Sequence, residues 1–114
     1  MHELEIITDE ACCRIPNVAL LPEREAEMLA GAMKAMGHPI RLQIMHILSQ
    51  TKGRLCVCEI EAAFDVSQPT VSHHLRTLRE AGLVDAEQRG LYLYYRIRPE
   101  TRDFVRGALR AILG

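Results

Sequence analysis

Apolar and polar residues between positions 55 and 83 form two short helical patterns that a tight turn separates. Apolar residues recur at helical spacing on one face of each pattern. They are Ile60, Ala63 and Phe64 in the first pattern and Val71, Leu75 and Leu78 in the second. Ser67 can cap the second helix, Pro69 is tolerated in its first turn, and Gly82 can end it. The stretch therefore predicts a helix-turn-helix.

Two runs that can pair as strands follow this motif, at residues 83–88 and 91–97. Arg89 and Gly90 separate them and form a short turn. The second run, LYLYYRI, has the aromatic and branched residues and the alternation of a strand with one covered face. A helix-turn-helix followed by a hairpin predicts a winged helix-turn-helix, a mainly α fold with a β-hairpin wing.

Three further helical patterns bring the expected total to about five helices. They begin near Leu20, at His38 with Pro39, and at Pro99. The second pattern predicts that Leu42 is buried, together with Ile40, Ile44, Met45, Ile47 and Leu48. Residues 1–19 show no sustained period, so we expect an N-terminal arm before a domain at residues 20–114. The arm contains Cys12 and Cys13.

The polar face of the second motif helix carries groups that can reach base edges and phosphates in a major groove. The candidates there are Gln68, Thr70, Ser72, His73, Arg76 and Thr77, and His74 is interpreted as a residue of the same helix, not as a ligand. The hairpin adds Arg89, Tyr92, Tyr94, Arg96 and Arg98 as candidates for backbone or minor-groove contacts. An ordinary solvated helix face would have a similar composition, but the hairpin favours double-stranded DNA as the partner.

The net charge of −1 does not by itself suggest a DNA-binding protein, but the charge is unevenly distributed. Residues 1–30 hold seven acidic and two basic groups, a net −5, whereas residues 67–98 hold five arginines and three acidic groups, a net +2. So modest a surplus predicts that two protomers bind together and that affinity falls with salt. No apolar run could span a membrane and no signal peptide is evident, so we expect a cytoplasmic protein without a membrane partner.

The sequence resembles the ArsR/SmtB family of metal-responsive repressors in four segments. These are HPIRLQIMHIL from His38, LCVCEI from Leu55, SQPTVSHHLRTLREAGLV from Ser67 and RGLYLYYRI from Arg89. The resemblance covers residues 29–97. It implies a winged-helix repressor, not an enzyme, that forms a homodimer through its first and last helices. Such a repressor leaves its operator when an effector binds.

Cys56 and Cys58 are the candidate sensing residues, because cysteines in a cytosolic chain favour metal binding or redox chemistry over structural disulfides. Residues two apart on a helix point to nearly opposite sides, so both sulfurs can reach one ion only if Cys56 precedes the helix or the first turn unwinds. A helix N-terminus also favours thiolate over thiol. The alternative is a pair of small buried hydrophobic residues.

Arsenite-responsive members of the family often carry a third cysteine one turn further on, where this chain has Glu61. We therefore expect Cys12 or Cys13 to complete a three-sulfur site for arsenite or antimonite, from the same or the other protomer. The alternatives are a cadmium, lead or zinc sensor that uses all four cysteines and a thiol redox switch. A thiol enzyme has little support, because no cofactor loop or paired base is evident. The histidines are not expected to be ligands, with His38 a capping or surface group and His46 partly buried.

Overall fold

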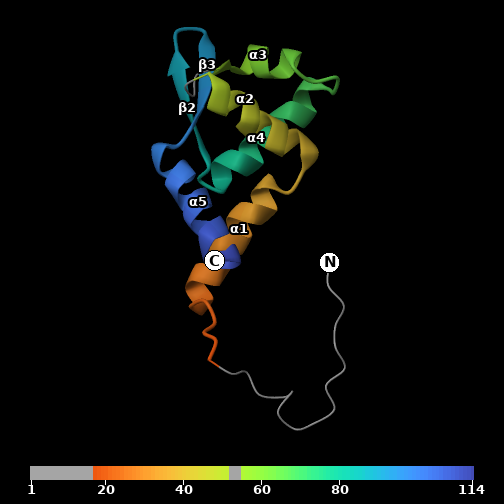
Figure 1. Ribbon diagram of the computed structural model, residues 1–114. Helices are drawn as coiled ribbons and strands as arrows, with labels where there is room; N and C mark the ends of the chain where they lie inside the picture. Colours follow the sequence, from red (N-terminus) through yellow and green to blue (C-terminus); the bar gives the residue numbers. More distant parts are fainter. Residues whose placement is uncertain (1–16, 52–54) are drawn as a thin grey trace.

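The computed structural model describes residues 17–51 and 55–114, which fold into five helices and a small sheet (Figure 1). The elements in chain order are α1 (Glu23–Met36), α2 (Pro39–Gln50), β1 (Leu55–Cys56), α3 (Val57–Ala62), α4 (Gln68–Glu80), β2 (Val84–Arg89), β3 (Tyr92–Ile97) and α5 (Pro99–Leu113). This confirms the mainly helical winged helix-turn-helix. No described helix has the length and the apolar character that crossing a membrane requires.

The core lies where α2, α3 and α4 meet the sheet. Its fully buried side chains include Ile44, Leu48, Ile60, Val71, Leu75, Leu78 and Val84. The predicted burial of Leu42 is wrong, because its side chain is 54% exposed. Ile44 and Leu48 define the buried face of α2, and Leu42 lies about 200° around the helix from Ile44. The imidazole of His46, expected to be partly buried, is exposed for the same reason.

The predicted capping residues hold α4 as expected. The Ser67 hydroxyl accepts from the Thr70 amide at 3.4 Å, and Pro69 lies in the first turn. Gly82 takes a φ of 77° just beyond the helix, a conformation that favours glycine. By contrast, α1 begins three residues later than the pattern near Leu20 predicted, because Pro22 is extended and forms its N-cap.

The sheet has the strand order β1-β3-β2 and is antiparallel throughout. Its strands β2 and β3 form the predicted wing, with Gly90 at a φ of 59° in the connection. The short strand β1, which the sequence pattern did not predict, pairs Leu55 with Tyr95 and Cys56 with Tyr94. Cys56 therefore pairs directly with β3, one of the two strands of the wing.

Candidate functional site

Helix α4 presents a polar surface opposite its buried face. The side chains of Gln68, His73 and Arg76 are exposed, whereas Val71 and Leu75 are buried in the core. Arg76 makes no ion pair with any other residue that the structure describes. An amide, an imidazole and a guanidinium are thus free to meet a partner, and they are groups that hydrogen-bond to base edges.

Three smaller polar residues of α4 are half-buried. Thr70 shares a 2.8 Å hydrogen bond with the Ser67 hydroxyl, and the Thr77 hydroxyl donates to the His73 carbonyl at 3.2 Å. Ser72 is half-buried on the same helix. The hydroxyls of Thr70 and Thr77 are thus already engaged in local contacts.

His74 belongs to α4, as expected, but not to its exposed polar surface. Its side chain is only 6% exposed, because it shares the spacing of Val71 and Leu78 on the buried face. Its imidazole lies against α2, where Arg41 contacts it. The helical spacing of His74 thus indicates burial, although its polar side chain alone would suggest exposure.

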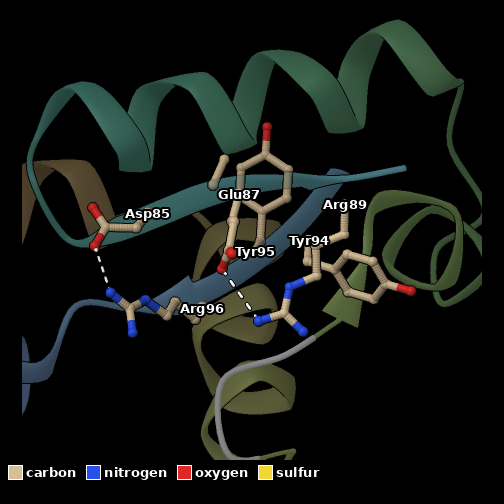
Figure 2. Close-up of a pocket in the computed structure, with 7 residues that line it drawn as sticks. Asp85, Glu87, Arg89, Tyr94, Tyr95 and Arg96 are labelled. Carbon is tan, nitrogen blue, oxygen red and sulfur yellow. Dashed lines mark hydrogen bonds and ion pairs between the residues drawn. The ribbon is translucent and has the colours of Figure 1, made fainter. Parts of the chain in front are cut away.

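The wing carries its basic side chains next to acidic ones (Figure 2). Arg89 Nη2 lies 3.4 Å from Glu87 Oε2, and its guanidinium lies 5.8 Å from the ring centre of Tyr94. Arg96 Nη2 lies 3.5 Å from Asp85 Oδ2, its register partner on β2. These pairs are exposed and therefore weak, so a phosphate can compete for either guanidinium. Nevertheless they reduce the positive charge that the arginines alone predicted for the wing.

Two further predicted wing residues differ in whether they already have partners in the fold. Tyr92 is 54% exposed and lies beside the hairpin tip. Arg98 lies at the start of α5 and pairs with Asp85 at 3.6 Å and Glu100 at 2.6 Å. Tyr92 is therefore available to a partner, whereas Arg98 connects the wing to α5.

Cys56 and Cys58 lie together at the junction of β1 and α3. Cys56 ends β1 with extended backbone angles and is the N-cap of α3, so the condition that it precede the helix is met. The two Sγ atoms are 2.7 Å apart. Cys56 is buried, and its amide donates to Glu59 Oε1 at 3.1 Å, whereas Cys58 is exposed. One sulfur is thus fixed by the fold and the other faces solvent.

The expected preference of this pair for thiolate does not hold for Cys58. The hydrogen bond with Cys56 raises the pKa of the Cys58 thiol, and a partial loss of hydration and the neighbouring Cys56 charge raise this pKa further. Backbone amides at the start of α3 act in the opposite direction, but their effect on this pKa is smaller. Cys58 therefore holds its proton at neutral pH.

The donor set suits a soft ion but supplies only part of its ligands. Thiolate sulfurs favour arsenic, cadmium, lead or zinc. Within residues 17–51 and 55–114, no three His, Cys, Asp or Glu residues are placed to hold a metal ion. The predicted ligands Cys12 and Cys13 lie outside the described residues. Glu61, one turn beyond Cys58, has a buried Oε1 without a hydrogen-bond partner among the described residues.

We expect the affinity for cadmium to rise with pH, because the ion must displace the proton that the raised pKa keeps on Cys58. One released proton corresponds to about tenfold per pH unit below that pKa. Calorimetric titration at pH 6.5, 7.5 and 8.5, in buffers of different ionisation enthalpy, would measure both affinity and proton release. Affinity independent of pH would contradict the protonated state of Cys58.

An exposed polar helix within a helix-turn-helix, followed by a β-hairpin, defines a winged-helix DNA-binding domain. Comparison with known proteins places it further: the chain belongs to the arsR family of bacterial regulatory proteins, and residues 38–86 match that family's profile. The resemblance to this family is thereby confirmed, and the matched range includes the first three of the four segments. Because the family consists of DNA-binding transcriptional regulators, the expectation that the chain is not an enzyme is confirmed as well.

Individual relatives agree with this assignment. The arsenic resistance transcriptional regulator ArsR1 of Pseudomonas putida is 41% identical over 69 residues, which are 60% of this chain and 54% of that protein. The cadmium resistance transcriptional regulatory protein CadC of Listeria innocua is 39% identical over 70 residues, 61% of this chain and 58% of CadC. This chain thus spans about half the length of these relatives.

The fold is also found among solved structures. The crystal structure of a possible transcriptional regulator for arsenical resistance superposes with a TM-score of 0.65 at 30% identity. The superposition covers 72% of this chain and 83% of that protein.

Proposed function

We propose that this chain is a dimeric transcriptional repressor that leaves its operator when trivalent arsenic or antimony binds Cys56, Cys58 and a third cysteine. The observation that carries the proposal is the placement of Cys56 at the N-cap of α3, which brings its sulfur beside that of the exposed Cys58. Operator DNA is bound by the exposed residues of α4, with the wing residues Arg89, Tyr92 and Arg96 on the adjacent backbone or minor groove.

The position of the cysteine pair supports a direct route from ion binding to DNA release. Cys56 ends β1 and Cys58 lies in the first turn of α3, so an ion that both sulfurs ligate ties the strand to the start of this helix. Adjusting to the ligand geometry of that ion rearranges the first turn of α3. Ile60 anchors this short helix in the core that also holds Val71 of α4. A shift of α3 is therefore transmitted to the helix that contacts DNA.

A second copy of the chain is the proposed partner of α1 and α5. These helices line one groove, and several of their apolar side chains are exposed, with Met28 at 55%, Leu109 at 47% and Ile112 at 54%. Covering such a surface is favourable by about 25 cal/mol for each Å² of apolar area. We call α4 the recognition helix. A two-fold dimer would place its two copies about 34 Å apart, which requires a near-palindromic operator.

The names of the relatives, which mention arsenic and cadmium, support a soft ion as effector. Cadmium, lead or zinc bound by all four cysteines is the second candidate. A redox switch through a disulfide between Cys56 and Cys58, whose sulfurs are adjacent, is the third candidate.

Operator binding followed by fluorescence anisotropy distinguishes these candidates. The reduced protein is titrated separately with arsenite, cadmium, zinc and hydrogen peroxide. We expect release by about one arsenite per protomer at concentrations where zinc and peroxide have no effect. Release by cadmium or zinc but not arsenite would overturn the arsenic assignment in favour of a four-ligand site, and release by peroxide alone would indicate the redox switch.

The arm cysteines can be tested by loss and restoration. Replacing Cys12 and Cys13 with serine should leave operator binding intact and weaken the response to arsenite. Adding Glu61→Cys to that variant should restore the response, because it places a third sulfur one turn beyond Cys58. Glu61→Gln is the matched control and should restore nothing. An undiminished response in the arm variant would exclude the arm as a source of ligands.

A further inference from the structure

A buried histidine of α4 is held against the beginning of α2. His74 is 6% exposed, and its Nδ1 lies 3.0 Å from Arg41 Nη1, although the two residues are 33 positions apart in the sequence. The ring of His38 lies beside it, with 4.3 Å between ring centroids and an angle of 41° between the ring planes. An arginine and two histidines thus occupy the contact between α2 and the recognition helix.

The same cluster also includes the end of α1. Arg41 Nε donates to the carbonyl oxygen of Ala35, in the last turn of α1. His38 is the N-cap of α2, as the sequence suggested, and its Nδ1 accepts from the Ile40 amide at 3.1 Å. One guanidinium therefore connects three helices, and both groups that contact His74 are fixed by the start of α2.

The chemistry of this contact determines the protonation state of His74. A guanidinium has only donors, so His74 Nδ1 must accept, which requires the neutral imidazole with its proton on Nε2. A proton on Nδ1 would remove the acceptor and place a second cation beside Arg41. Burial of this second positive charge is energetically unfavourable. The hydrogen bond therefore exists only while His74 is neutral.

The surroundings of His74 oppose its protonation. Burial lowers the pKa of His74 first, and the charges of His38 and Arg41 on α2 and of His73 on α4 lower it further. The group that α1 contributes is the uncharged carbonyl of Ala35. Arg41 has no acidic partner among the described residues that would offset these charges.

We infer that Arg41 and His74 are positioning residues for the recognition helix, and that protonation of His74 breaks their hydrogen bond and weakens operator binding. The inference rests on the proposed binding of DNA by α4. His74 lies on the same helix as the exposed His73 and Arg76 but on the opposite face. A displacement of α4 against α2 at His74 therefore also displaces these two side chains. Base contacts tolerate displacements of only about 0.5 Å.

The test uses His74→Asn, because the asparagine oxygen can accept from Arg41 but does not titrate. Operator affinity is measured by anisotropy between pH 8 and pH 5 at constant ionic strength, with metal excluded. We expect wild-type affinity to fall below pH 6.5, by up to about tenfold per protomer for each pH unit below the lowered pKa of His74. The affinity of His74→Asn should not fall in acid, because asparagine has no group that takes up a proton. His46→Asn, which changes an exposed histidine of α2, should follow the wild type.

A second variant keeps the inference testable if His74→Asn does not fold. Arg41→Gln retains a donor but removes the charge that lowers the pKa of His74, so the acid loss of affinity should move to higher pH. NMR titration of the His74 ring in the free protein should give a pKa below the ordinary histidine value of 6.5 and the Nε2–H tautomer. An ordinary pKa, or a wild-type profile in His74→Asn, would overturn the inference.

These measurements also separate the inference from the proposed function. If the wild type binds no operator at any pH, the proposed function fails and the claim about operator affinity fails with it. The NMR titration then still decides whether His74 is held neutral by Arg41. If the wild type binds but its affinity does not fall in acid, the proposed function stands and the positioning role is wrong.

Discussion

Replacing Cys56 and Cys58 together with serine should abolish release from the operator by arsenite while leaving operator binding intact. Serine is close to cysteine in shape and is a good helix N-cap, so α3 should begin at the same place. Its hydroxyl is a poor ligand for soft ions. Mutating a residue that only hydrogen-bonds to a metal ligand typically lowers the affinity for the metal about 10–100-fold. Loss of two ligands should therefore lower the affinity for arsenite more than about 100-fold. Anisotropy titration measures the change.

The single variant Cys58→Ser separates the loss of a ligand from a loss of stability. Cys58 is exposed and Cys56 is buried, so Cys58→Ser isolates the loss of a ligand from any change in packing. Thermal unfolding of Cys58→Ser should therefore match that of the wild type, while its response to arsenite falls. If the double variant were released by the same arsenite concentration as the wild type, the pair would not be the effector site.

The helix-turn-helix could be predicted because its signals are local. Apolar residues on one face of α4, the cap at Ser67 and the left-handed Gly82 all act within a few residues of one another. The strand β1 could not be predicted, since two residues have no period to detect. Its pairing of Cys56 with Tyr94 joins segments about forty residues apart in the chain.

The candidate site likewise has features that follow from local sequence and others that depend on tertiary contacts. The need for Cys56 to precede α3 follows from helix geometry, and the structure places it there. The helical spacing places His74 on the buried face of α4, but its hydrogen bond with Arg41 depends on the folded chain, which alone brings the two within 3.0 Å. Likewise the pairing of Arg96 with Asp85 depends on the strand register of the wing. Tertiary contacts decide these cases, and no local pattern encodes them.

The cysteine pair has two structural connections to the DNA-binding surface. One runs through α3 and the buried Ile60 to α4. The other runs through the pairing of Cys56 with Tyr94, whose ring lies 5.8 Å from the Arg89 guanidinium of the wing. A displacement at the sulfurs can therefore reach both the recognition helix and the wing, which makes this position suitable for a switch.

Arg76→Ala should weaken operator binding strongly without altering the stoichiometry of metal binding. Arg76 is exposed on α4 and has no ion pair among the described residues, and alanine favours the helix at least as well. One good base contact is worth about 1–3 kcal/mol. In a dimer both copies are lost, so we expect about 2–6 kcal/mol, which is about 30-fold to 10⁴-fold in affinity. Anisotropy with operator and with unrelated DNA measures the loss.

The matched control is Arg102→Ala, which removes the same charge from an exposed position on α5. A general loss of charge would weaken both variants alike, whereas a contact at the operator weakens only Arg76→Ala. Salt dependence then identifies the contact. If Arg76 binds phosphate, the variant should lose about one unit of salt slope per copy and bind all sequences less well. If Arg76 hydrogen-bonds a base, specificity falls with little change in slope. Equal affinities of the two variants would remove Arg76 from the DNA interface.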